Sequence, residues 1–149
     1  AELATWVHSV DRLKIAERLS AQNPYFDRPI QICLQVNISA EDTKSGVRPE
    51  QLGELATAVT KLPNIRLRGL MAIPATENDF SQQRQTFAAV RSLMEQLNAQ
   101  GFQLDTLSMG MTNDLEAAIA EGATIVRIGT AIFGARSVST IITNSIPRP

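Results

Sequence analysis

Short apolar runs alternate with longer stretches of helical periodicity along almost the whole chain. The apolar runs lie at residues 6–10, 30–38, 65–71, 104–108 and 123–128, and the helical stretches at 11–21, 49–61, 79–99, 113–120 and 131–135. Strands that alternate regularly with helices form a parallel sheet with right-handed crossovers. Five βα units are too few for a complete eight-stranded barrel of about 250 residues. The sequence therefore predicts an α/β protein, either a small doubly wound sheet or part of a (β/α)8 TIM-type barrel.

The bulk composition excludes several classes of partner. The chain has 149 residues and a formal net charge of −1, so it has no basic excess that would attract nucleic acid. Its apolar runs are far shorter than the roughly 20 residues that span a bilayer, so no membrane partner is expected. With one cysteine, Cys33, and one histidine, the sequence predicts neither a metal site nor a disulfide. A cytoplasmic location is the expectation for such a chain.

Two junctions near the end of the chain are the candidate binding sites. In parallel α/β folds, ligands bind at the carboxyl ends of the strands, and barrels often hold phosphate after their last two strands. Ser108-Met109-Gly110 and Gly129-Thr130 follow the last two apolar runs and combine a hydroxyl with a glycine. Glycine lets the backbone approach a ligand, and successive N–H groups at a helix start bind anions. The pattern indicates a phosphate site, although glycines that serve turns alone would look the same.

Arg127 stands out because it lies within the apolar run 123–128, where a buried guanidinium is costly unless it is paired. Two residues before Gly129, it points to the same side of the strand as that glycine. It therefore faces either a ligand's ring nitrogen or carboxylate, or a structural acid such as Asp105 or Glu116. The sequence does not separate these two interpretations.

Five segments of the chain carry a resemblance to a known family. They are VNIS at 36–39, KSG at 44–46, RGLMAIP at 68–74, LSMGMTNDLEAAI at 107–119 and VRIGTAIFGAR at 126–136. In this order they resemble the YggS/PROSC family of pyridoxal phosphate homeostasis proteins, and the opening HSVD at 8–11 agrees. The resemblance covers nearly the whole chain to residue 136.

The resemblance implies a fold, a cofactor and a function. Residues 1–136 would be the C-terminal portion of a single barrel like the N-terminal domain of alanine racemase, about strands four to eight with their helices. Residues 137–149 would be a flexible tail. By this resemblance, the chain would bind pyridoxal 5′-phosphate (PLP), as members of the family do, usually without amino-acid turnover, and would act in intracellular vitamin B6 homeostasis. By the same resemblance, Ser108, Met109, Gly129 and Thr130 lie at the phosphate, and Arg127 faces the pyridine nitrogen.

One departure from the family pattern concerns the cofactor lysine. In the family this lysine lies on the first barrel strand, in a motif like Val-Ser-Lys-Thr, whereas the lysines of this sequence are Lys14, Lys44 and Lys61 in other contexts. We therefore expect the first three strands and the covalent anchor to be absent from the chain, which leaves the phosphate half of the site. A barrel without those strands exposes sheet edges. A homodimer or a strand exchange would cover them.

Two other functions fit parts of the pattern. A racemase-type PLP enzyme would need a lysine and a tyrosine as bases, but the single tyrosine, Tyr25, lies in a proline-bracketed loop, so no catalytic residue is predicted. A generic α/β module that binds phosphate or sulfate is the third interpretation. His8 and Asn37 lie near strand ends, and a structural role is favoured for both.

Overall fold

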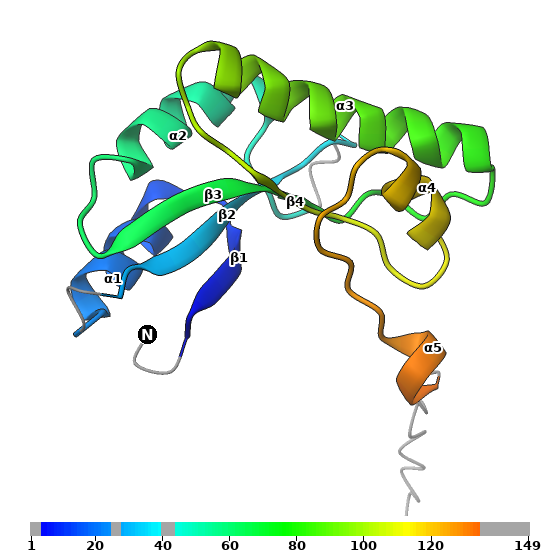
Figure 1. The fold of residues 1–149 in the computed structure, drawn as a ribbon, viewed down its shortest axis with the longest axis horizontal. Helices are drawn as coiled ribbons and strands as arrows, with labels where there is room; N and C mark the ends of the chain where they lie inside the picture. The colour runs from blue at the N-terminus through cyan, green and yellow to red at the C-terminus, as the bar shows by residue number, and fades with distance from the viewer. Residues whose placement is uncertain (1–3, 25–27, 40–43, 135–149) are drawn as a thin grey trace, which may run out of the picture.

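The computed structural model describes residues 4–24, 28–39 and 44–134, which form a parallel β-sheet covered by helices (Figure 1). The elements follow in the order β1 (Trp6–Val10), α1 (Leu13–Gln22), β2 (Ile30–Val36), η1 (Pro49–Gln51), α2 (Leu52–Val59), β3 (Ile65–Ala72), α3 (Phe80–Ala99), β4 (Thr106–Ser108), α4 (Leu115–Ala120) and α5 (Thr130–Phe133). The strands are hydrogen-bonded in the order β1-β2-β3-β4, and each neighbouring pair is parallel. The parallel α/β architecture predicted from the alternation is confirmed.

One hydrophobic core lies between the sheet and helices α1 to α4. Alternate residues of β2 point into it, namely Ile30, Ile32, Leu34 and Val36, as the two-residue period of a strand requires. The helices contribute Ala16 from α1, Leu52, Leu55, Ala56 and Val59 from α2, Phe87, Val90 and Leu97 from α3, and Ala117 and Ala118 from α4. The helices therefore cover the same face of the sheet. This is the arrangement of a barrel wall, because a doubly wound sheet carries helices on both faces.

Irregular registers in β1 and β3 change which residues face the core. In β3 the pairing with β2 shifts between Ile32 and Cys33, so that Leu67 and Leu70 both face the helices although two residues lie between them. Arg68, which directly follows Leu67, points to the opposite face by the ordinary alternation of a strand. A similar shift in β1 lies between Val7 and Val10, the stretch that contains His8.

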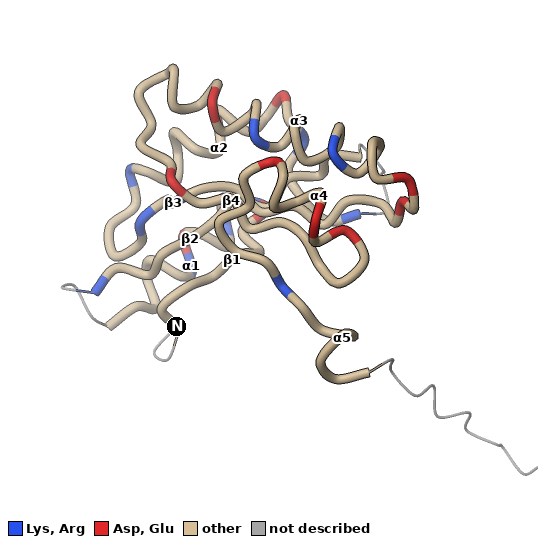
Figure 2. Tube along the Cα trace, turned by 45° about the vertical axis from the view of Figure 1, so that its right-hand side comes forward, with Lys and Arg blue, Asp and Glu red and all other residues tan. Residues whose placement is uncertain are grey.

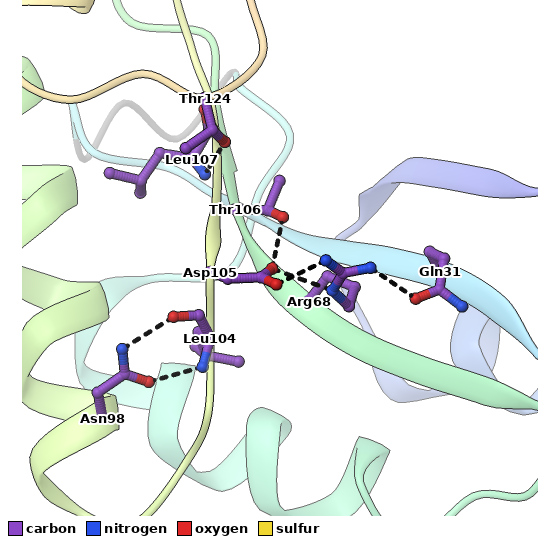
Figure 3. A network of polar contacts seen from close by, with 8 residues as sticks. All are labelled: Gln31, Arg68, Asn98, Leu104, Asp105, Thr106, Leu107 and Thr124. Carbon is purple, nitrogen blue, oxygen red and sulfur yellow. Dashed lines mark hydrogen bonds and ion pairs between the residues drawn. The ribbon is translucent and has the colours of Figure 1, made fainter.

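The face opposite the helices carries a network of polar side chains (Figure 3). The Arg68 guanidinium donates to both carboxylate oxygens of Asp105 at 3.0 and 2.6 Å and to the Gln31 Oε1 at 3.0 Å. Its carbon Cζ also lies 5.1 Å from the ring centre of Trp6, a favourable cation–π distance. The hydrogen bonds from Arg68 lower the pKa of Asp105. The network ties β1, β2 and β3 to the start of β4 on their uncovered side.

The predicted fifth strand at 123–128 is wrong as a full strand. The segment runs beside β4 and pairs with it at one bridge, between Ser108 and Ile125. Gly110 then turns the chain at φ +94°, so that the Arg127 N–H donates to the Gly110 carbonyl at 2.9 Å and the ladder does not continue. A side chain at Gly110 would also meet the Ala118 Cβ at 2.5 Å. The turn that ends the sheet therefore depends on glycine.

In the sequence, Asn113 followed three residues later by Glu116 resembles a capping box, and the structure contradicts this expectation. Helix α4 begins at Leu115 with Asp114 as its N-cap, and that carboxylate accepts from the Met111 N–H at 2.6 Å instead of capping the helix. The carboxylate therefore closes a tight turn in the loop between β4 and α4.

Helix α4 is attached to α3 by a buried carboxylate. Glu121 is 4% exposed and binds Arg84 at 2.6 Å and Arg91 at 3.1 Å, both from α3. Elsewhere, residues of both signs are interspersed over the described chain (Figure 2). In the same part of the chain, the helices are too short or too polar to cross a bilayer.

Candidate functional site

Three stretches of chain at the carboxyl end of the sheet enclose a cavity of about 280 Å³. The lining consists of residues 74–77 after β3, residues 111–114 after β4, and Arg127, Gly129 and Thr130 before or at the start of α5. This is the edge at which parallel α/β folds bind ligands. The cavity volume is close to the lower end of the range for small-molecule sites, about 300–1,000 Å³.

The start of helix α3 fixes two walls of this cavity. Gln83 is 8% exposed, and its side-chain amide donates to the Glu77 carbonyl at 2.7 Å and to the Asn113 carbonyl at 3.3 Å. Asp79 caps the helix by accepting from the Gln82 N–H at 2.9 Å. The loops after β3 and β4 are therefore held together by a side chain with few alternative positions.

Arg127 reaches the cavity without an ion pair among the described residues. Its guanidinium donates to the Ser108 Oγ at 2.7 Å and to the Ala72 carbonyl at 3.0 Å. Within the described residues no carboxylate lies within 4 Å of it, and Asp105 is taken by Arg68. Burial lowers the pKa of the Arg127 guanidinium, and the negative charge of Asp114 opposes that shift. The ion pair with Asp105 or Glu116, which the sequence left open, is thus wrong.

Thr130 contacts Thr112, a residue that the sequence did not single out as a site candidate. The Thr130 hydroxyl lies 3.0 Å from the Thr112 hydroxyl, which also accepts from the Ala131 N–H at 3.3 Å. Gly129 lines the cavity, and a side chain at this position would meet nothing within 4 Å. Thr112 lies two residues after Gly110 in a loop at a strand end. That placement was the available signal in the sequence.

Ser108 and Met109 lie beneath the cavity. Both are fully buried at 0% exposure. The Met109 N–H donates to the Ile125 carbonyl at 3.1 Å, and its side chain belongs to the hydrophobic core. The Ser108 hydroxyl is in contact with Arg127 and, at 2.7 Å, with His8 Nδ1. Both residues therefore support the floor of the site, whereas Arg127, Gly129 and Thr130 line it.

The other residues that the sequence singled out do not line the cavity or lie outside the described residues. Cys33 is buried, and burial raises the pKa of its thiol to about 12. The Asn37 amide donates to the Lys44 carbonyl at 3.2 Å and so holds the loop after β2, as its predicted structural role requires. Tyr25 and the tail at 137–149 lie outside the described residues. Among the described residues no cluster of potential metal ligands occurs.

Comparison with known proteins identifies the family of this fold. The chain belongs to the alanine racemase N-terminal domain family, which matches residues 1–137. Among solved structures, PipY from Synechococcus elongatus has a TM-score of 0.77 and 35% identity, with 87% of this chain and 61% of that chain covered. PipY is known both without PLP and with PLP bound. D-threonine aldolase from Filomicrobium marinum, at 19% identity and a TM-score of 0.70, shares the fold.

Two curated relatives of the chain share the name pyridoxal phosphate homeostasis protein. The pyridoxal phosphate homeostasis protein of Pseudomonas aeruginosa is 61% identical over 136 residues, which are 91% of this chain and 58% of that protein. The protein of the same name from Escherichia coli is 50% identical over 139 residues, 93% of this chain and 59% of that protein. The chain thus spans less than two thirds of the length of these relatives. The family resemblance drawn from the sequence motifs is confirmed.

Proposed function

We propose that the cavity at the carboxyl end of the sheet holds pyridoxal 5′-phosphate, and that the chain serves intracellular vitamin B6 homeostasis by binding it. The observation that carries the proposal is the Arg127 guanidinium, whose hydrogen-bond partners are both neutral. It lies at a cavity whose lining includes the hydroxyls of Thr76, Thr112 and Thr130 and the carboxylates of Glu77 and Asp114. A half-buried cation is stabilised by an acceptor on a ligand. The names of the relatives and the PLP-bound form of PipY support PLP as that ligand.

The residues at the cavity fit the two ends of this cofactor. Thr112, Gly129 and Thr130 would hold the phosphate, because their hydroxyl and backbone groups lie together at an open stretch of chain. Arg127 would face the ring nitrogen and, as a donor, would keep it unprotonated. Ser108 and Met109 would lie beneath the cofactor and support its site. Ser108 would do so by accepting a hydrogen bond from Arg127. When bound, PLP would supply a reactive aldehyde and an electron-withdrawing ring.

The chain would do no catalysis of its own in this proposal. An unprotonated ring nitrogen makes the cofactor a weaker electron sink, and this disfavours racemase-type chemistry. We also propose that β1 to β4 correspond to strands four to seven of an eight-stranded barrel, with the segment at 123–128 in the place of the eighth. The helices on one face of the sheet and the family match to residues 1–137 support this assignment.

Equilibrium binding of PLP to the 149-residue chain, followed by absorbance and by competition with inorganic phosphate, tests the proposal. We expect saturable binding that phosphate competes with and that Arg127→Met weakens. The matched control is Arg18→Met, which removes an exposed arginine of α1 and should leave binding unchanged. If both variants bind as the parent does, or if the parent does not bind PLP, the proposal is wrong.

A further inference from the structure

His8 contacts Ser108, which lies 100 residues later in the sequence and beneath the cavity. Its Nδ1 lies 2.7 Å from the Ser108 Oγ, and that oxygen lies 2.7 Å from Nη1 of Arg127. The three side chains come from β1, from β4 and from the segment before α5, so they form a chain of hydrogen bonds across the polar face of the sheet. His8 lies within the irregular stretch of β1, a feature that often re-aims a side chain toward a site.

The hydrogen-bonding capacity of each group determines the direction of this chain. Arginine only donates, so the Ser108 oxygen accepts from Arg127. The serine hydroxyl has one hydrogen, and because Ser108 is fully buried, that hydrogen needs an acceptor. The His8 Nδ1 is the acceptor within reach, which places the imidazole proton on Nε2. The burial of the ring and, second, the neighbouring charge of Arg127 lower the pKa of His8 and so favour its neutral form.

We propose that His8 is a positioning residue for the cofactor site: by accepting the Ser108 hydrogen at Nδ1, it turns a lone pair of that hydroxyl toward Arg127 and holds the guanidinium at the cavity. The inference rests on the proposed function, because Arg127 is the group that would face the cofactor ring. Arg127 makes a second hydrogen bond, from Nη2 to the Ala72 carbonyl. This bond fixes Nη2 only, so the direction of Nη1 depends on Ser108. Without His8 the serine hydroxyl would rotate, and the guanidinium would lose its fixed direction.

The tautomer of His8 tests the first step without any cofactor. His8 is the single histidine of the sequence, so the ¹⁵N signals of an imidazole-labelled chain belong to it alone. At pH 7.5 we expect a neutral ring with the proton on Nε2 and an accepting Nδ1. In Ser108→Ala we expect that preference to weaken, because the donor to Nδ1 is gone. A proton on Nδ1 in the parent chain would contradict the proposal.

Binding of PLP and of inorganic phosphate to three variants tests the second step. His8→Ala should weaken PLP binding about fivefold, the effect of one ordinary hydrogen bond, and leave phosphate binding unchanged. His8→Asn keeps an acceptor on the γ branch of the side chain and should bind PLP as the parent does. His8→Ala combined with Ser108→Ala should lose no more affinity than Ser108→Ala alone, because both act through Arg127.

The outcomes separate the two proposals. If the parent chain binds no PLP, the proposed function is wrong, and the His8 tautomer alone then decides whether the hydrogen-bond chain exists. If the parent binds PLP but His8→Ala binds it equally well, the positioning role of His8 is wrong and the proposed function stands. Equal losses in His8→Ala and His8→Asn would also contradict the role, because they would show that the acceptor is irrelevant. Thermal unfolding followed by circular dichroism verifies that each variant is folded.

Discussion

Replacement of Gly69 by alanine should destabilise the chain far more than an ordinary methyl addition. Gly69 lies in β3 opposite Thr106 of β4, and a Cβ at this position would overlap the backbone carbonyl of Thr106. That carbonyl cannot move away without separating β4 from β3, because Thr106 is itself the residue of β4 that pairs with Gly69. Overpacking in a closed site costs about 1–3 kcal/mol and more when backbone has to move. We therefore expect a loss of about 3 kcal/mol in the free energy of unfolding.

The matched control is Gly53→Ala, one position into helix α2. The nearest atom to a Cβ there is the Gln100 side-chain oxygen at 3.8 Å, which is ordinary contact. Helix η1 runs directly into α2, so Gly53 lies in continuous helical backbone, where alanine is favoured over glycine by about 0.5–1 kcal/mol. The two glycine-to-alanine changes should therefore shift stability in opposite directions, although they add the same methyl group.

Urea unfolding followed by the fluorescence of Trp6, the single tryptophan, measures both variants. With a slope of about 2 kcal/mol per M, the midpoint should fall by about 1.5 M in Gly69→Ala and rise by about 0.3 M in Gly53→Ala. A Gly69→Ala midpoint within 0.3 M of the parent, a margin of about 0.6 kcal/mol on that slope, would refute the close approach of β3 and β4.

Three further outcomes follow from the structure. Glu121→Gln should lower the free energy of unfolding by about 1–2 kcal/mol, because two half-exposed arginines lose a buried carboxylate; an unchanged urea midpoint in 0.1 M salt would contradict this. Cys33, with its buried thiol and a pKa of about 12, should react with a thiol reagent at pH 8 only as fast as the chain unfolds, and rapid stoichiometric labelling of the native chain would show the thiol to be accessible. The lowered pKa of His8 makes its contribution to stability complete above the unfolded-state pKa of about 6.5. That contribution should be lost as the pH falls toward the folded-state pKa, because burial of the ring and then the charge of Arg127 disfavour its charged form; His8→Asn should lack this part of the pH dependence in urea midpoints.

The strands and helices that bury a regular apolar pattern could be predicted from the sequence. The run at 30–38 became β2 (Ile30–Val36), and the helical stretch at 79–99 became α3 (Phe80–Ala99). In both segments the period of the apolar residues matches the face that packs against the core. In these two segments the local apolar pattern agrees with the burial in the folded chain, so a short window of sequence is sufficient to predict the element.

The end of the sheet could not be predicted in the same way. The segment at 123–128 is as apolar as a strand, but its ladder is interrupted by the positive φ of Gly110 in the neighbouring loop. The start of α4 depends on the Asp114 carboxylate, which bonds backwards to the Met111 N–H. Both features are set by the conformation of one loop, and the periodicity of the surrounding residues contains no information about it.

Only some residues of the candidate site could be located from the sequence, because the others enter it through the fold of a loop or through a contact between distant residues. Arg127, Gly129 and Thr130 could be located because strand ends and glycines are visible in sequence. Thr112 enters the site through the fold of the loop after β4. The contact between His8 and Ser108 joins residues 100 positions apart, which a single sequence does not bring together. Whether a homodimer or a strand exchange covers the sheet edges stays a prediction, and analytical ultracentrifugation would decide it.

The location of PLP in a crystal structure of the 149-residue chain with the cofactor is the most direct measurement. Our account predicts the phosphate within hydrogen-bond distance of Thr112 and Thr130, and the ring nitrogen facing Arg127, with Ser108 and His8 still in contact beneath it. Density for PLP at another place on the chain, with Arg127 and the cavity unchanged, would contradict the account.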